Sequence, residues 1–299
     1  MAEELPATAQ PWMGQARIAQ IRSSGTWGSA LTSDEFAAIR SVGFDPVGQV
    51  FGAAVYSVGH DGYRCPATWR TLPDPQVSGS GDPGSFGPLV RAMGQARETA
   101  MSRLVAECRQ LGGHGVVGVR LSIGSFPAGG PEFLAIGTAV RAEGTAPAPG
   151  VPFTCGLSGQ DFAKLIMTGW VPAGLVLGIS IGSRHDDLST ARQTRVTTGN
   201  AEVAGWTELV SESRRDARRQ LEGDVRRFGA EGVVIQTMPL RVRQRDCPAQ
   251  VGRHDHVVEA TFTGTAVTRF ATGGPRQARP TLTVMSLNPE RDQVSRFRI

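Results

Sequence analysis

The sequence is poor in lysine and in aromatic residues. Lys164 is its one lysine, and Phe, Trp and Tyr make up 6% of the 299 residues. Nucleic-acid-binding proteins concentrate positive charge on one face and add aromatic side chains that stack on bases. Here a formal net charge of +4 is carried almost wholly by arginine in a chain with few aromatics. This composition argues against a nucleic-acid partner and favours a solvated basic surface.

Long apolar runs are missing as well. No window approaches the roughly 18 consecutive apolar residues of a membrane-spanning helix. Glu3 and Glu4 lie where a secretory signal would carry positive charge before an apolar stretch. The four cysteines form no CxxC pair: Cys65, Cys108, Cys155 and Cys247. We therefore expect a cytoplasmic protein with reduced thiols and no membrane partner.

Sequence signatures of catalysis are also missing. The chain has no HExxH or Walker motif. Residues 79–84 (GSGDPG) match GxGxxG in form, but a dinucleotide-binding loop follows a strand and opens a helix, whereas this stretch lies among prolines. We predict that the protein is not an enzyme and has no catalytic residues. An enzyme or small-ligand binder with its site at a domain or subunit interface is the second alternative.

The chain does contain an internal repeat. Residues 31–44 (LTSDEFAAIRSVGF) resemble 157–170 (LSGQDFAKLIMTGW), and GTAV occurs at both 137–140 and 264–267. A third block lies between them and pairs Arg97, Ala100 and Leu104 with Arg214, Ala217 and Leu221. Three ordered blocks of matching residue types predict one domain present twice in tandem.

Each copy has the pattern of an α+β domain. A short helix opens it, and a strand with several glycines follows, at 47–58 and at 175–181. A long amphipathic helix comes next, with one apolar stripe formed in the first copy by Ala100, Leu104, Cys108 and Leu111. Two strands finish each copy, at 115–123 and 133–141 and at 233–242 and 257–270. The order predicts two tandem β-α-β-β domains, each an antiparallel sheet with one long helix packed across it.

Changes in composition set the domain boundaries that we predict. The loop at 59–90 is dense in Pro, Gly and Ser. Near the C-terminus, 281–287 (TLTVMSL) could add as a strand to some sheet edge, and a peptide or a protein is the second candidate partner. The predicted divisions are a flexible N-terminal segment at 1–30, a first domain at 31–141, a Pro/Ala/Gly linker at 142–156, a second domain at 157–270 and a C-terminal tail at 271–299.

Residues 96–119 carry the clearest family resemblance. They run from ARETA through a helix-ending glycine to GHGVVGV, which is similar to the helix-to-strand signature of the YbjQ-like family. GTAV at 137–140 resembles the final strand of that family, and the second copy keeps this strand and a degenerate form of the signature. The resemblance covers about 31–141 and 157–270.

The resemblance implies a dodecin-like fold assembled as a ring of five, together with the family's heavy-metal-binding label. The matched positions are Gly, Ala, Val and Thr, which suit close packing and are not metal ligands. Because whole two-domain chains cannot fill a five-membered ring without a leftover half, we predict five chains in two stacked rings. We expect a non-catalytic, ring-forming oligomeric scaffold or binding module whose partner is the chain itself. A heavy-metal-ion-binding protein is the alternative.

The metal alternative depends on His254 and His256. Residues i and i+2 of a strand point to one face, so both imidazoles could bind one divalent transition-metal ion. Cys247, shortly before them in the sequence, is the third candidate ligand. An exposed polar hairpin loop is the competing interpretation of these residues.

Two further clusters have less specific patterns. His185, Asp186 and Asp187 could hold a divalent ion, with a plain turn as the alternative. The arginines of the second long helix could bind phosphate or an acidic partner. Carboxylates alternate with these arginines, however, which favours a solvated and internally paired helix face.

Overall fold

The computed structural model describes residues 11–25, 28–57, 65, 86–126, 130–144, 150–194, 199–247 and 251–269. The elements of the first part of the chain are α1 (Pro11–Ser24), α2 (Ser33–Ser41), β1 (Phe44–Val55), α3 (Gly87–Gln110), β2 (Gly115–Phe126), β3 (Gly130–Ala142) and β4 (Phe153–Thr154). Those of the second part are α4 (Gly159–Met167), β5 (Trp170–His185), α5 (Leu188–Gln193), α6 (Ala204–Arg227), β6 (Gly232–Thr237), β7 (Leu240–Asp246) and β8 (His254–Arg269). None of the described helices is long and apolar enough to span a membrane.

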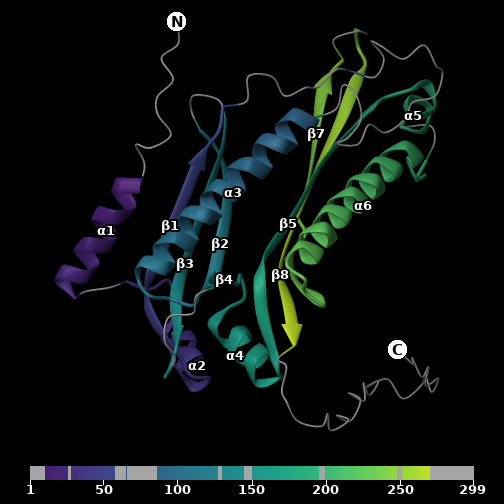
Figure 1. Cartoon of the computed structure of the whole chain (residues 1–299). Helices are drawn as coiled ribbons and strands as arrows, with labels where there is room; N and C mark the ends of the chain where they lie inside the picture. The colour runs from purple at the N-terminus through teal and green to yellow at the C-terminus, as the bar shows by residue number, and fades with distance from the viewer. Residues whose placement is uncertain are drawn as a thin grey trace, which may run out of the picture.

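Two sheets make up the fold. The first has the strand order β1-β3-β2-β4, antiparallel except that the short β4 runs parallel to β2. In the second, β8 is the central strand and pairs antiparallel with β5, β6 and β7. From left to right, Figure 1 shows α1, the first sheet with α3 in front of it, the second sheet and α6. The expected α+β class, with one long helix for each sheet, is confirmed.

Each long helix approaches its sheet closely at a glycine. Gly52 in β1 lies under α3, and a Cβ added there would overlap the carbonyl oxygen of Ala100. Gly178 in β5 has the same relation to Ala217 in α6. Glycine at these positions allows the backbones of helix and strand to touch. The two halves therefore pack helix on sheet in the same way.

Helix α3 also joins the two halves through a shared core. Its Ala96 lies in one apolar cluster with Phe133 of the first sheet and Leu177 of the second. Beside this core, Arg97 Nη1 of α3 donates to Asp224 Oδ2 of α6 over 2.9 Å, and both side chains are largely buried. The two halves therefore pack directly against each other, in addition to being joined by the segment between them.

Residues 11–24, which we expected to belong to a flexible segment, form α1. This stretch has no apolar stripe, so its helix depends on tertiary contacts and not on its own pattern. Ile18 is buried, and Arg17 forms an ion pair with Glu107 of α3. The prediction of a flexible segment is therefore wrong for this stretch.

Three other predicted boundaries move. Helix α3 begins at Gly87, because Pro88 suits a first helical turn. The predicted linker contains β4 and the buried Cys155, since this stretch adds to the edge of the first sheet. The strand expected at 233–242 is the two strands β6 and β7, and the pairing of β6 with β8 shifts register near its end. The GxGxxG match and the C-terminal tail, with its predicted strand, lie outside the described residues.

Candidate metal centre

Four residues with metal-binding side chains meet where β5 ends: Cys65, His185, Cys247 and Asp255. His185 is the last residue of β5 and lies directly opposite Asp255 in the register with β8, so strand pairing brings these two together. The N–H of Cys247, just after β7, donates to the Arg253 carbonyl oxygen over 2.9 Å and closes the β7–β8 hairpin. Cys65 comes from the first half, from the segment between β1 and α3.

The ligand atoms of these residues form a tight cluster. Cys65 Sγ lies 3.3 Å from Cys247 Sγ, 3.3 Å from Asp255 Oδ1 and 3.5 Å from His185 Nδ1. His185 Nδ1 and Asp255 Oδ1 lie 2.7 Å apart. All four ligand atoms are within 4.8 Å of one another, so one ion could contact them together.

These distances fit a four-coordinate ion. Zinc lies about 2.3 Å from cysteine sulfur and about 2.0–2.2 Å from histidine nitrogen or carboxylate oxygen, so a tetrahedron spaces its ligand atoms about 3.4–3.8 Å apart. The four separations given above reach that spacing if the atoms move apart by at most about 0.7 Å. The two sulfurs are 3.3 Å apart, whereas a disulfide needs about 2.05 Å. Two thiols, one imidazole and one carboxylate form a donor set that suits zinc and related divalent ions.

The burial of the cluster separates it from an ordinary polar surface. Cys65, Cys247 and Asp255 are 1%, 7% and 0% exposed, and both cysteines belong to the apolar cluster that α3 shares with the second sheet. An ionised carboxylate in such surroundings is costly unless a positive charge or several hydrogen bonds compensate it. A divalent cation at the centre would supply that charge to the carboxylate and to both thiolates.

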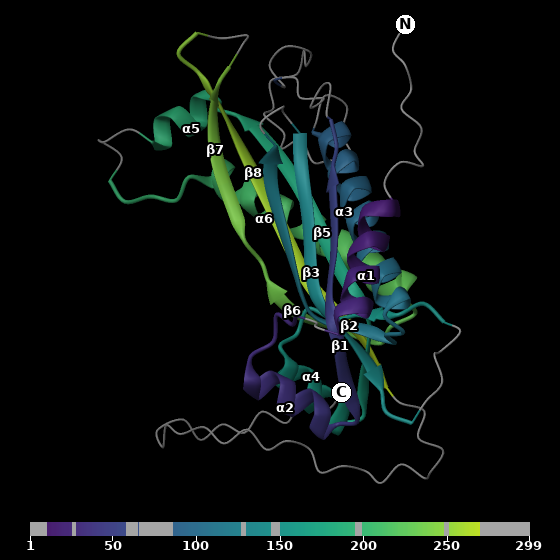
Figure 2. The same cartoon turned by 90° about the vertical axis from the view of Figure 1, so that its left-hand side faces the viewer.

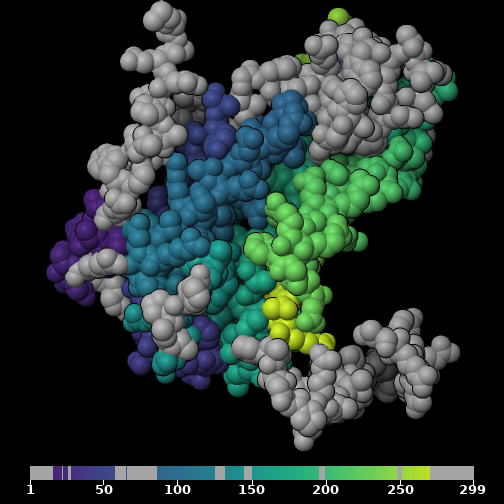
Figure 3. All heavy atoms as spheres, viewed as in Figure 1, coloured from purple at the N-terminus to yellow at the C-terminus, as the bar shows by residue number. Residues whose placement is uncertain are grey.

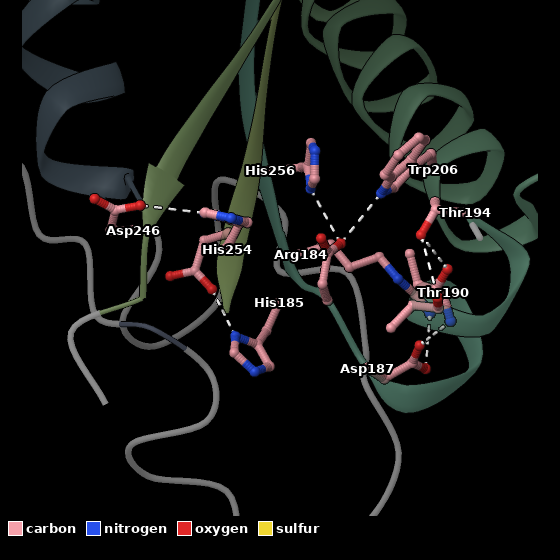
Figure 4. Close-up of polar contacts among 12 residues, drawn as sticks. Arg184, His185, Asp187, Thr190, Thr194, Trp206, Asp246, His254 and His256 are labelled. Carbon is pink, nitrogen blue, oxygen red and sulfur yellow. Dashed lines mark hydrogen bonds and ion pairs between the residues drawn. The ribbon is translucent and has the colours of Figure 1, made fainter. Parts of the chain in front are cut away.

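Of the three ligands predicted from the sequence, Cys247 lies in this cluster and the two histidines contact other groups. His254 Nδ1 lies 3.2 Å from Asp246, and its side chain is 41% exposed. His256 Nδ1 lies 3.0 Å from Asp186. Figure 4 shows both rings apart from the ring of His185. The sequence-predicted set of two histidines and one cysteine is therefore not assembled in the structure.

The sequence patterns do not predict one ligand set that contains Cys65, His185 and Asp255. The alternation that places two histidines on one face of β8 turns the intervening Asp255 to the other face, toward His185. Cys65 is far from its neighbours in sequence and reaches them only because the two halves pack together. The one signal available beforehand was the scarcity of cysteine and histidine in the chain.

The triplet His185, Asp186 and Asp187 divides among separate neighbours. While His185 joins the cluster, Asp186 Oδ1 accepts a hydrogen bond from Trp206 Nε1 over 3.2 Å. Asp187 is the N-cap of α5, and its Oδ1 accepts from the Thr190 N–H over 2.6 Å. Burial raises the pKa of Asp187, but the hydrogen bonds from Thr190 outweigh it and hold that pKa below its ordinary value. The triplet does not act as one ligand set.

A groove of about 360 Å³ lies beside β5, between α3 and α6. Figure 3 shows these two helices side by side on the face toward the viewer. Arg97 and Asp224 line the groove but pair with each other, and Arg97 also donates to the Leu175 carbonyl oxygen over 2.8 Å. Burial lowers the pKa of Arg97, and the neighbouring Asp224 carboxylate counteracts part of that effect. The small-ligand site predicted from the sequence at a domain or subunit interface stays a prediction.

Comparison with known proteins places the chain in a family. Residues 82–143 match the family described as "Putative heavy-metal-binding". Over 264 residues the chain is 33% identical to encapsulin nanocompartment protein Rv1762c of Mycobacterium tuberculosis, an alignment that covers 86% of this chain and 90% of that protein. The chain belongs to the family of that mycobacterial protein. Shorter relatives match only part of it.

One shorter relative is a UPF0145 protein of Thermus thermophilus, which is 42% identical over 60 residues, or 20% of this chain and 53% of that protein. Another is a UPF0145 protein of Thermotoga maritima, 32% identical over 97 residues, or 32% of this chain and 82% of that protein. The matched segment 82–143 holds α3, β2 and β3, where the YbjQ-like resemblance was seen. All four cluster residues lie outside that segment, so the family label and the candidate site fall on different parts of the chain.

Proposed function

We propose that this protein holds a divalent transition-metal ion, zinc before others, at Cys65, His185, Cys247 and Asp255. The observation that carries the proposal is the convergence of four ligand atoms of three chemical kinds within 4.8 Å. Four protein ligands leave no open position for water or substrate, which is the arrangement of structural zinc sites and not of catalytic ones. The role that we propose for the ion is therefore to fix structure.

The origin of the ligands indicates what the ion would fix. Cys65 precedes α3 in the first half, whereas the other three come from the β5 end and the β7–β8 hairpin of the second half. An ion bound to all four would tie the segment before α3 to the second sheet. Because an unfolded chain offers no preformed site, the free energy of binding would add to the stability of the folded protein.

Protein purified natively, without chelators and without a metal-affinity column, is expected to retain about one zinc ion per chain. Inductively coupled plasma mass spectrometry measures this content. We expect Cys247→Ser and Asp255→Asn each to lower the retained zinc by at least about tenfold, since each replaces an anionic ligand by a weak neutral one. His254→Gln is the matched control, because His254 neighbours Asp255 on β8 but contacts Asp246 instead. Loss of zinc in His254→Gln but not in Asp255→Asn would reverse the assignment.

We also propose that the two halves are copies of one domain and that the chain assembles with itself as a non-catalytic scaffold. The mycobacterial relative is named for a nanocompartment, and a compartment is built from many chains. One feature of this chain supports assembly: Phe51 and Val55 in β1 are 40% and 46% exposed. Leu177 and Ile181, at the matching places of β5, are buried against the first half. The first sheet thus exposes an apolar face, whereas the matching face of the second sheet is covered by the first half.

The stoichiometry that we predicted from the sequence is five chains in two stacked rings. Light scattering at increasing protein concentration would then reveal a species of five times 31.7 kDa. Because the two halves share a core, they form two consecutive layers within one chain. This arrangement favours a head-to-tail assembly, in which the second half of one chain packs against the first half of the next. A mass of one chain at every concentration would contradict self-assembly in either arrangement.

A further inference from the structure

Helices α1 and α3 carry the same five residues. The sequence MGQAR occurs at 13–17 and again at 93–97. In each helix the motif ends in an arginine whose side chain contacts another element. Arg17 of α1 contacts β1, and Arg97 of α3 contacts α6. The corresponding stretch of α6 is VSESR, which keeps only the arginine, Arg214. The shared motif and the shared contact indicate that α1 and α3 dock in the same way.

Arg97 closes the open edge of β5. Its Nη1 donates to Asp224 Oδ2 over 2.9 Å, and its Nη2 donates to the Leu175 carbonyl oxygen over 2.8 Å. Asp224 Oδ2 in turn accepts the N–H of Leu177 over 3.2 Å. An arginine from one layer and an acidic side chain from the next thus satisfy the backbone groups that an edge strand leaves open.

Arg17 makes the matching contacts at the edge of β1. Its Nη2 pairs with the Glu107 carboxylate, and its Nη1 donates to the Gln49 carbonyl oxygen over 3.4 Å. Glu107 Oε2 also accepts the N–H of Phe51 over 2.7 Å. Counted from the matching Gly52 and Gly178, the counterparts of Gln49 and Phe51 in the second half are Leu175 and Leu177. Counted from the matching Ala100 and Ala217, the counterpart of Glu107 is Asp224.

Helix α1 therefore occupies, beside the first sheet, the place that α3 occupies beside the second. Figures 1 and 2 show α1 next to β1 and α3, at the end of the molecule away from α6. It spans 14 residues where α3 spans 24. The shorter helix leaves Phe51 and Val55 exposed. Helix α1 therefore covers only part of this surface of the first sheet.

We propose that this surface, the β1 edge with Glu107 and the apolar face with Phe51 and Val55, binds helix α6 of a second copy, and that α1 caps it within the same chain. Helix α6 is the last helix in the order of layers, and its Arg214 is exposed at the position of Arg97. A second copy's α6 would continue the order of helix and sheet and place that arginine against Glu107. The inference rests on the proposed self-assembly and adds that α1 regulates it by covering the binding surface.

The two occupants differ in how they compete for the surface. Helix α1 is tethered to the first sheet by a short connection, so its effective concentration is on the order of millimolar. It also carries the whole motif, whereas α6 keeps only the arginine. The cap therefore holds the surface in dilute protein, and assembly requires either a high concentration or release of α1.

Light scattering on the full-length chain and on Arg17→Glu tests this competition. Charge reversal places two carboxylates together, so α1 should leave the surface and the concentration at half-assembly should fall by at least about tenfold. Adding Arg214→Glu to Arg17→Glu should cancel that gain. Lys164→Glu, the same charge change on the exposed face of α4, is the control. Hydrogen exchange at residues 16–24 reports whether α1 has left, and Arg17→Ala replaces Arg17→Glu if reversed charge disturbs the first half.

The outcomes separate this inference from the assembly on which it rests. If the unaltered chain assembles and Arg17→Glu exchanges freely in α1 without changing the half-assembly concentration, the cap is refuted and self-assembly stands. Continued protection of α1 in Arg17→Glu and Arg17→Ala would show that Arg17 does not hold it. If Arg214→Glu leaves the gain intact, α6 is not the partner. If no variant assembles at any concentration, self-assembly itself fails.

Discussion

Adding zinc to the metal-free protein is expected to raise its free energy of unfolding by about 4 kcal/mol when free zinc is about 1,000 times its dissociation constant. The reason is that the folded chain holds the four ligand atoms within 4.8 Å, whereas the unfolded chain does not. Urea unfolding followed by circular dichroism, with and without zinc, measures the difference. The gain should shrink as pH falls, because protons compete with the metal for thiolate and imidazole.

Asp255→Asn should remove most of this zinc-dependent gain, since it replaces the buried carboxylate by a weaker, neutral ligand. His254→Gln should keep it in full, because that ring contacts Asp246 and is partly exposed. An equal gain in the unaltered chain and in Asp255→Asn would mean that zinc stabilises the protein from another place, and the proposed site would be abandoned.

The second large effect is expected at the buried ion pair between α3 and α6. Arg97→Ala should cost about 3 kcal/mol, because it leaves the carboxylate of Asp224 in the interior without its main partner. The Leu175 carbonyl oxygen loses its donor as well. We place the cost at the low end of the range for broken buried pairs, since the exposed Arg227 also contacts Asp224. Urea unfolding of the two proteins at one pH measures the change.

Lys164→Ala is the control for this measurement, because it breaks an exposed pair with Asp161 and should cost less than about 1 kcal/mol. Near-equal stabilities of Arg97→Ala and Lys164→Ala would show that the contact between α3 and α6 is not fixed by this ion pair. The account of how Arg17 and Arg97 dock would then lose its energetic basis.

Local sequence patterns were sufficient for most of the fold. The stripe of Ala100, Leu104 and Cys108 predicts a helix with one buried face, and α3 has all three residues buried. Alternation at 115–123 and 133–141 predicts paired strands, as β2 and β3 are. These features depend on neighbours a few residues away, so a single sequence contains them.

The metal cluster depends on contacts that no local pattern encodes. The sequence prediction started from His254 and His256 on one strand face, and Cys247 was added because it lies shortly before them in the sequence. The residue that joins it is Asp255, which the pleat of β8 turns toward His185. Cys65 arrives from the other half of the chain, 182 residues before Cys247. Predicting the set requires the packing of the two halves, which follows only from the assembled fold.

Helix α1 was missed for the opposite reason. It has no apolar stripe, so a search for helical periodicity passes over it. The repeated MGQAR was visible in the sequence, however, and a short identical motif can mark a shared docking contact even where the helix around it is weakly patterned. The equivalence of Arg17 and Arg97 gives that repeat a physical meaning.

X-ray absorption spectroscopy at the zinc edge, on natively purified protein, tests the central claim most directly. The proposed site predicts two sulfur atoms at about 2.3 Å and two nitrogen or oxygen atoms at about 2.0–2.2 Å from the metal. Asp255→Asn should alter the light-atom shell and Cys247→Ser should halve the sulfur shell. A metal surrounded only by nitrogen and oxygen, or a spectrum that neither substitution changes, would contradict the assignment of the ion to these four residues.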